Sequence, residues 1–142
     1  MKVGDAEALR LAVGLLEDRL RALPAAGLRG AELFVLATVE ALGAGAFPTA
    51  IGDRLGMRRS NVSAAVKDLE RRGFVEHLVV ADGADGRRRP VCLTERGLAA
   101  LHAQERERDR WLAVQGTELF TADEASLLRD AVPLLLRLAR AG

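Results

Sequence analysis

The stretch that decides the fold runs from Thr49 to Leu93 and reads TAIGDRLGMRRSNVSAAVKDLERRGFVEHLVVADGADGRRRPVCL. It opens with a short helical pattern that ends at Leu55, with Ile51 on the same face. Gly56 follows, and glycine adopts the left-handed backbone of a tight turn at little cost. The small Gly52 would let a second helix approach closely. These residues therefore predict a helix that ends in a turn.

A second helical pattern begins between Arg58 and Ser60 and continues to Arg72. Its inner stripe is apolar at spacings of three and four residues: Val62, Ala65, Val66 and Leu69. Its opposite face carries long donors, short hydroxyls, an amide and a small methyl group: Arg59, Ser60, Asn61, Ser63, Ala64 and Lys67. These residue types contact the phosphates and base edges of duplex DNA, and the small ones would let the helix enter a groove.

Gly73 ends the second helix, and FVEHLVV follows with the apolar bunching of a strand. The next residues, ADGADG, contain Asp-Gly twice, which is a strong hairpin signal. The segment RRRPVCL is predicted to return as a second strand, with Pro90 at an edge because proline cannot donate to a ladder. Three cations, Arg87, Arg88 and Arg89, lie at or just after the tip. The whole stretch predicts a winged helix-turn-helix, a fold that points first to duplex DNA.

Helices are also predicted before this stretch. Residues 5–22 form an amphipathic pattern with Asp5 as a candidate N-cap, and they could pack on this domain or on a partner chain. Residues 29–42 are apolar around most of the circumference, which is typical of a central core helix. Gly43 suits a left-handed position at the end of that helix.

Two further helices are predicted after the wing. Thr94 is a candidate N-cap for the first, whose polar run 102–110 is typical of a solvent-bridging connection. A capping box from Thr121 to Glu124 opens the last helix, in which Pro133 predicts a kink or a split. That helix carries more leucines than one side of a small domain needs. A dimer interface shared with the N-terminal helix would cover them.

Composition is that of a folded protein of one domain, with 49% hydrophobic and 29% charged residues. No apolar run approaches the roughly 20 residues that span a bilayer, and the N-terminus lacks the apolar core of a signal peptide. A single cysteine, Cys92, excludes an internal disulfide and suits a reducing compartment. We therefore expect a cytoplasmic protein with no membrane partner.

The net charge of the chain is only +1, but the charges are unevenly distributed. Residues 58–93 hold eight basic and five acidic side chains, a net charge of +3, while the segments before and after are each −1. The excess falls on the second helix and the wing, where phosphates would be met. A solvated charged face is the alternative interpretation of this bias.

The sequence gives no pattern that predicts an enzyme or a metal site. Its histidines are His77 and His102, and no nucleophile, paired-carboxylate or phosphate-loop arrangement is readable. We expect His77 to be structural or at the surface, and Cys92 to be a packed small hydrophobe more than a redox switch. Trp111 and Phe34 could line an effector pocket or could belong to the core. No cofactor is predicted.

The run from Asp85 to Gly97, DGRRRPVCLTERG, resembles the wing signature of the MarR family of transcription regulators, D-x-R followed by L-T-x-x-G. The preceding RLGMRRSNVSAAVKDLERRGFV is similar to the helix-turn-helix of that family. A departure is Arg58, where such helices more often begin with a serine or threonine cap.

The resemblance implies roles for individual residues. Asp85 would brace the wing by pairing with Arg87, and the tip arginines would reach a minor groove or its phosphates. Other DNA-contacting side chains would come from the second helix: Arg58, Arg59, Ser60, Asn61, Ser63, Ala64 and Lys67. Peroxide sensors of this family carry their reactive cysteine in the N-terminal helical part, where this chain has none.

The sequence thus predicts a mainly α fold with a small β-wing, a winged helix-turn-helix domain with N- and C-terminal dimerisation helices. Residues 29–97 would form the DNA-binding lobe, and residues 1–25 and 98–142 a helical dimerisation lobe. The predicted function is a homodimeric repressor that binds a pseudo-palindromic duplex site, with release by a small-molecule effector left open. The alternative is a winged-helix module for protein–protein contact, with its arginine tip meeting an acidic partner.

Overall fold

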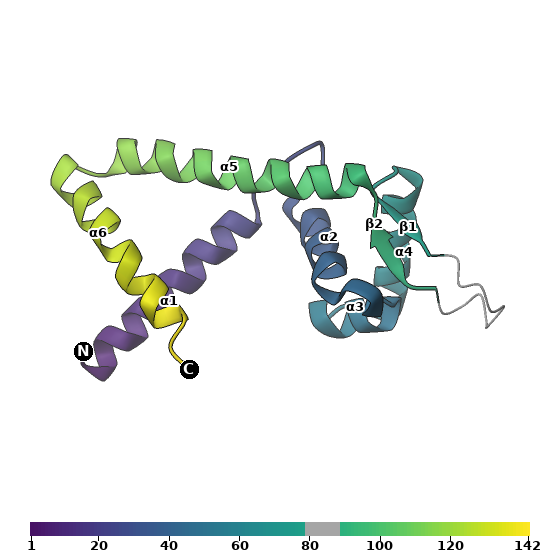
Figure 1. Cartoon of the computed structure of the whole chain (residues 1–142), viewed down its shortest axis with the longest axis horizontal. Coiled ribbons are helices and arrows are strands. Elements are labelled where there is room, and N and C mark those ends of the chain that lie inside the picture. Colours follow the sequence, from purple (N-terminus) through teal and green to yellow (C-terminus); the bar gives the residue numbers. More distant parts are fainter. Residues whose placement is uncertain (79–88) are drawn as a thin grey trace. The chain divides into compact units, whose positions relative to one another are not determined.

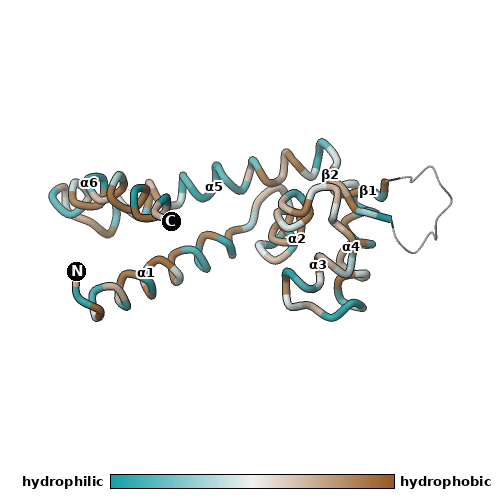
Figure 2. The backbone as a smooth tube through the Cα atoms, turned by 60° about the horizontal axis from the view of Figure 1, so that its bottom comes forward, coloured by the Kyte–Doolittle hydropathy of each residue, from teal (hydrophilic) through white to brown (hydrophobic). Residues whose placement is uncertain are grey.

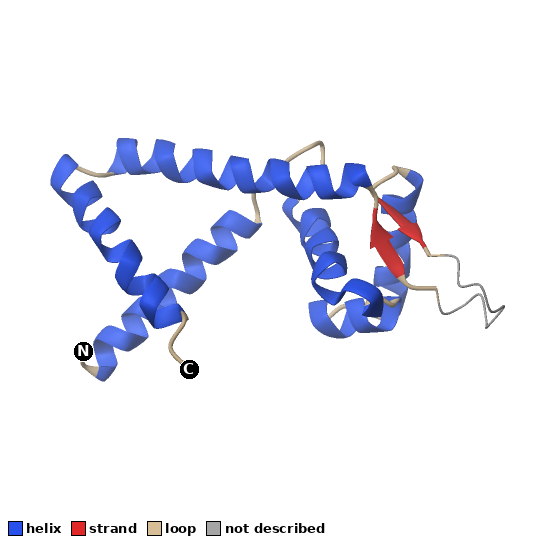
Figure 3. Cartoon of the chain, viewed as in Figure 1, coloured by secondary structure: helices blue, strands red, loops and turns tan. Residues whose placement is uncertain are grey.

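A computed structural model describes residues 1–78 and 89–142 (Figure 1). Helix α1 spans Val3–Arg21, α2 spans Gly30–Leu42, and a 3-10 turn, η1, spans Gly43–Gly45. The helix-turn-helix follows as α3, Pro48–Leu55, and α4, Arg59–Arg71. Strands β1, Val75–His77, and β2, Val91–Leu93, precede α5, Glu95–Leu119, and α6, Ala122–Ala139 (Figure 3). This order confirms the predicted mainly α fold with a β-wing.

Two compact units make up the chain, residues 1–107 and residues 108–142. The hydrophobic core of the first unit is built around α2, whose buried side chains include Leu33, Leu36 and Val39. The rest of this unit, apart from α1, contributes apolar side chains that are nearly inaccessible to water: Leu28, Ala46, Ile51, Val62, Val66, Leu69, Phe74, Val75, Val91, Ala100 and Leu101. The prediction that residues 29–42 form a central core helix is therefore confirmed.

Local signals in the sequence account for most helix ends. Gly56 ends α3 in the left-handed conformation, with φ 65° and ψ 30°, as predicted. Gly43 has the expected positive φ of 55°, but its ψ of −126° lies outside the left-handed helical region, because the chain turns at once into η1. The prediction of Asp5 as an N-cap is wrong. Lys2 is the N-cap, and the Asp5 carboxylate accepts a hydrogen bond of 2.9 Å from the Lys2 N–H.

The wing is an antiparallel pair in which Val75 faces Leu93 and His77 faces Val91. The carbonyl of Pro90, directly before β2, accepts a hydrogen bond of 2.9 Å from the Leu78 N–H. The side of β2 away from β1 is also held, because the Val91 N–H donates to the carbonyl of Ala46 at 2.8 Å. The base of the wing is thereby fixed to the turn that precedes α3.

The end of α4 is joined to the start of α5 by a close contact between backbones. The Thr94 hydroxyl donates to the Gly73 carbonyl at 2.6 Å and accepts from the Gly97 N–H at 3.1 Å, which confirms Thr94 as a cap. A Cβ atom added at Gly97 would lie 2.1 Å from the carbonyl oxygen of Phe74. Only glycine at residue 97 lets the two elements approach so closely.

A buried glutamine of α5 donates hydrogen bonds to the backbone at the end of α1. Gln104 lies in the run expected to be polar all round and outside a core, yet only 3% of its surface is exposed. Its side-chain amide donates to the carbonyls of Leu23 at 2.8 Å and Arg21 at 3.3 Å. That expectation is wrong at this position, because the Arg21 carbonyl at the end of α1 and the Leu23 carbonyl just beyond it lie where the helix no longer supplies a donor.

The second unit contains the predicted capping box at the start of α6. The Thr121 hydroxyl accepts from the Glu124 N–H at 3.2 Å, and the Glu124 carboxylate accepts from the Thr121 N–H at 2.9 Å. Helix α6 continues through Pro133 and is therefore not split. Among the described residues, no helix is long and apolar enough to cross a membrane.

Helices α1 and α6 contain no buried residues, although both are rich in apolar side chains (Figure 2). In α1, Leu11 and Leu15 are 57% and 62% exposed. In α6, Leu127 and Leu134 are 70% and 59% exposed. Water contact with so much apolar surface is unfavourable, so both helices offer faces that a further protein surface would cover.

We predict that Gly97→Ala lowers the free energy of unfolding by about 2 kcal/mol, because the new Cβ would overlap the Phe74 carbonyl. Urea unfolding followed by circular dichroism measures this loss. Gly116→Ala in the same helix is the control, since a Cβ at Gly116 meets nothing within 4 Å. The control should gain roughly 0.5–1 kcal/mol from helix propensity. Equal stability of the two variants would contradict the prediction.

Candidate nucleic-acid interface

Helix α4 buries one face and exposes the other, as the sequence predicts. Val62, Val66 and Leu69 are at most 3% exposed and pack into the core. The opposite face is formed by exposed side chains, all of them predicted to contact DNA: Arg59, Ser60, Asn61, Ser63, Ala64 and Lys67. Arg58 is also exposed and occupies the N-cap position without a side-chain capping hydrogen bond. The usual serine or threonine cap is therefore absent, and Ser60 does not replace it.

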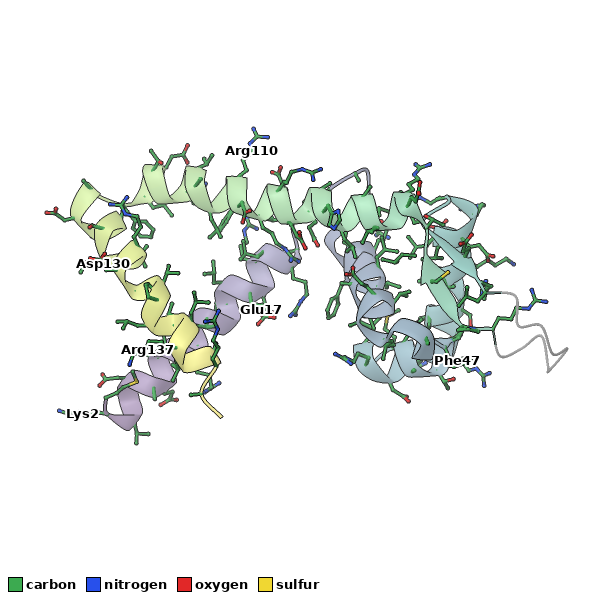
Figure 4. The ribbon with its side chains drawn as sticks, in the orientation of Figure 1. Lys2, Glu17, Phe47, Arg110, Asp130 and Arg137 are labelled. Atoms are coloured by element: carbon green, nitrogen blue, oxygen red, sulfur yellow. The ribbon has the colours of Figure 1, made fainter. Side chains whose placement is uncertain are left out.

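Close packing of α3 against α4 sets the position of this exposed face. A Cβ added at Gly52 would lie 3.1 Å from the Met57 carbonyl oxygen and 3.3 Å from Cγ2 of Val62. The expectation that Gly52 permits a close approach is confirmed. Phe47, at the start of α3 (Figure 4), precedes Pro48 in the first turn, where proline lacks only an N–H that has no helical partner.

Between α3 and α4 lies an open groove of about 540 Å³. Its walls include Thr49 and Asp53 from α3, four residues apart, and Arg59 and Ser63 from α4, also four apart. The sequence predicted DNA contacts for the two α4 residues and none for Thr49 and Asp53 on α3. The proline at the start of α3, followed by a hydroxyl residue, was the signal that could have identified Thr49 as a candidate.

Some of the basic charge counted from the sequence is held within the protein. Arg71 pairs with Asp68, and Arg72 pairs with Glu32 and Asp68 while donating to the Gly27 carbonyl at 3.3 Å. In contrast, the exposed cations of the polar face, Arg58, Arg59 and Lys67, have no ion pair within residues 1–78 and 89–142. The charge available to an external anion therefore lies at the N-terminus of α4 and at Lys67 on its exposed face.

Glu32 connects the core helix α2 to the end of α4. Burial alone would raise the pKa of Glu32, but hydrogen bonds from the Arg29 backbone and side chain and from Arg72 lower the pKa below its ordinary value of 4.5. The same bond to Glu32, with that to Asp68, raises the pKa of Arg72. Both groups are thus charged near neutral pH, and their pairing fixes the C-terminal end of α4 to the core.

The wing is described at its base and not at its tip. Arg89 is exposed, as a DNA-contacting residue would be, whereas Asp85, Arg87 and Arg88 lie outside the described residues. Their predicted roles stay predictions. At the base, a nitrogen of the His77 ring lies 3.1 Å from a Glu70 carboxylate oxygen, in keeping with the expected structural place of that histidine.

Cys92 is partly buried, and its Sγ lies 3.9 Å from Oε1 of Glu76. Burial raises the pKa of this thiol, and the adjacent carboxylate raises it further. The protonated thiol is a poor nucleophile, which agrees with a packing residue. Within the part of the chain that the structure describes, no group of three or more His, Cys, Asp or Glu side chains could hold a metal ion.

Phe34 does not belong to the closed core. Its ring is 37% exposed, and the Arg21 guanidinium lies over it at 4.5 Å from the ring centre. A hollow of about 260 Å³ beside the ring is lined by Asp18, Arg21, Ala22, Gly30, Ala31 and Phe34.

Comparisons with known proteins agree with this geometry. A sequence profile described as the MarR family matches residues 26–88. A proposed transcriptional regulator from Pseudomonas aeruginosa PA01 is 31% identical over 99% of this chain and 96% of its own, with a TM-score of 0.70. The chain belongs to the MarR family. The family resemblance stated from the wing and helix-turn-helix motifs is thereby confirmed.

Other solved structures share the MarR-family fold at lower identity. The PcaV transcriptional regulator from Streptomyces coelicolor, in complex with its natural ligand, is 25% identical over 95% of this chain and 91% of its own, with a TM-score of 0.53. A mutant MepR from S. aureus, bound to an oligodeoxyribonucleotide, is 17% identical over 95% and 97% of the two chains, with a TM-score of 0.63. The comparison with curated proteins finds no match.

We predict that Glu32→Gln lowers the stability of this MarR-family chain by about 1 kcal/mol at neutral pH, because a neutral amide pairs less well with Arg72. The folded-state pKa of Glu32 is lowered, so its carboxylate stabilises the fold above pH 4.5 and loses this effect as pH falls through the lowered pKa. Thermal unfolding of wild type and variant should therefore differ at pH 7 and converge near pH 3. A difference that persists unchanged at low pH would contradict this account.

Proposed function

We propose that this chain is a DNA-binding transcriptional regulator without catalytic activity, acting in the cytoplasm as a homodimeric repressor at a pseudo-palindromic site. The observation that carries the proposal is the exposed polar face of α4, whose Arg59 and Lys67 form no ion pair with any residue that the structure describes. Such a face supplies phosphate contacts through its cations and base contacts through Ser60, Asn61 and Ser63. Membership in the MarR family supports the same conclusion.

The proposed DNA-binding and dimerisation lobes follow from which elements are buried and which are exposed. Residues 29–97 form the DNA-binding lobe, because they hold most of the core, the helix-turn-helix and the base of the wing. Residues 1–25 and 98–142 form the dimerisation lobe, since α1 and α6 bury nothing within one chain. A two-fold dimer would present its two α4 helices to major grooves about 34 Å apart.

The proposal includes release of DNA by a small-molecule effector. Support comes from the partly exposed Phe34 ring and the hollow beside it, which combine an apolar surface with the Arg21 cation. The solved PcaV complex with its natural ligand is a family-level precedent for such binding.

Selection of bound duplexes from a random pool is the direct test of DNA recognition. The proposal expects an enriched sequence with two-fold symmetry, and salt-dependent gel shifts on the promoter beside the protein's own gene. Failure to bind any duplex over a range of salt would remove the proposal. Contact with an acidic protein that persists without nucleic acid and needs the wing arginines would favour the protein-binding alternative.

We predict that Arg59→Ala weakens binding to the selected duplex by roughly fivefold and lowers the salt slope by about 1 per subunit, because one phosphate contact is lost. Arg71→Ala is the matched control, since Arg71 lies on the same helix but pairs with Asp68. The control should leave both quantities nearly unchanged. Equal losses for the two variants would show that total charge, rather than its placement, governs binding.

We predict that Leu128→Glu combined with Leu135→Glu converts a dimer into a monomer, because both side chains are exposed on α6 and charges there could not be buried. Sedimentation equilibrium measures the change in mass. Arg129→Glu alters the net charge by the same amount on the same helix and should leave the dimer intact. A monomeric wild type, or an equal effect of the control, would contradict the proposed interface.

A further inference from the structure

The groove between α3 and α4 contains a carboxylate that a DNA-binding surface would not be expected to carry. Asp53 is exposed and lines this groove together with Thr49, Arg59 and Ser63. No ion pair holds the Asp53 side chain among the described residues. A phosphate that entered the groove beside Asp53 would meet an uncompensated negative charge.

The two ends of this groove differ in electrostatic character. Helix α3 begins at Pro48, so its first N–H groups and the positive end of its dipole lie beside Thr49. Asp53 lies four residues further along the same wall, near the end of the helix. The Thr49 end therefore favours a phosphate, and the Asp53 end disfavours one.

We propose that Asp53 is a specificity-determining residue of this interface, and the inference rests on the proposed DNA-binding function. The carboxylate excludes phosphate from its end of the groove and accepts a hydrogen bond from an exocyclic amino group of a base, cytosine above all. Duplexes that place a base edge there are accepted. Duplexes whose best register places a phosphate there are penalised, so Asp53 weakens non-cognate binding more than cognate binding.

Arg59 on the opposite wall strengthens this effect. Arg59 attracts a phosphate, and Asp53 in the same groove partly offsets that attraction without forming an ion pair with Arg59 among the described residues. Removing the Asp53 charge would strengthen the attraction of Arg59 for phosphate in any register. The change would raise affinity without raising discrimination.

The test compares wild type, Asp53→Asn and Glu40→Gln on two duplexes. One duplex is selected by wild type from a random pool, and the other is a scrambled duplex of equal composition. Asparagine preserves the shape of Asp53 and removes its charge. Glu40 is an exposed carboxylate of α2 that does not line the groove, so its change to Gln reproduces the difference in net charge.

We expect Asp53→Asn to bind the scrambled duplex about threefold to fivefold more tightly, the effect of one exposed charge interaction, and the selected duplex no more tightly than wild type. The ratio of the affinity for the selected duplex to that for the scrambled duplex then falls about threefold to fivefold. Glu40→Gln should leave this ratio unchanged. A repeated selection with Asp53→Asn should lose its preference at one base pair in each half-site.

Two results would overturn the inference. If Asp53→Asn changes both affinities by one factor, as Glu40→Gln does, Asp53 acts only through net charge, and the DNA-binding proposal stands. If wild type does not distinguish or bind the duplexes at all, the proposed function fails and the role of Asp53 fails with it.

Discussion

There is no room for a side chain at residue 97, because a Cβ there would lie 2.1 Å from the carbonyl oxygen of Phe74. That contact sets how closely α5 approaches the end of α4, and the Thr94 hydroxyl bridges the same junction from Gly73 to the Gly97 N–H. The polar face of α4 is therefore held from behind by backbone contacts. Because the helix itself is held in place, side chains as short as Ser63 can reach a binding partner from its surface.

The positions of the charged side chains matter more than their sum in this chain, because the net charge is only +1. Arg72 forms ion pairs with Glu32 and Asp68 and donates a hydrogen bond to the Gly27 carbonyl, and the pair with Glu32 holds α4 to α2. Arg59 and Lys67 remain available on the outer face. The basic residues of one helix thus divide into those that fix its position and those that could meet an anion.

Features set by neighbouring residues could be predicted from the sequence. Gly56, Thr94 and the box from Thr121 to Glu124 act within a few residues, and the structure confirms each of them. Hydrogen bonds between distant residues could not be predicted, because periodicity shows which face of a helix is buried but not which polar groups meet. Gln104 was assigned to a solvated stretch, yet its partners are more than 80 positions away.

The residues predicted to contact DNA were inferred from their type and face, and the structure places those it describes on exposed surface. Asp53 was not among them, because a carboxylate is not a residue type expected to contact a phosphate backbone. The role proposed for Asp53 depends on its sharing a groove with Arg59, and that relation is visible only once α3 and α4 are packed together.

The amide of Gln104 also has a consequence for how the chain opens. The carbonyls of Arg21 and Leu23 take their hydrogen bonds from α5, so the last turn of α1 cannot fray while that part of α5 stays folded. The end of α1 and the middle of α5 therefore belong to one cooperative opening unit. In hydrogen exchange, amides in these two segments would lose their protection together, although they are far apart in the chain.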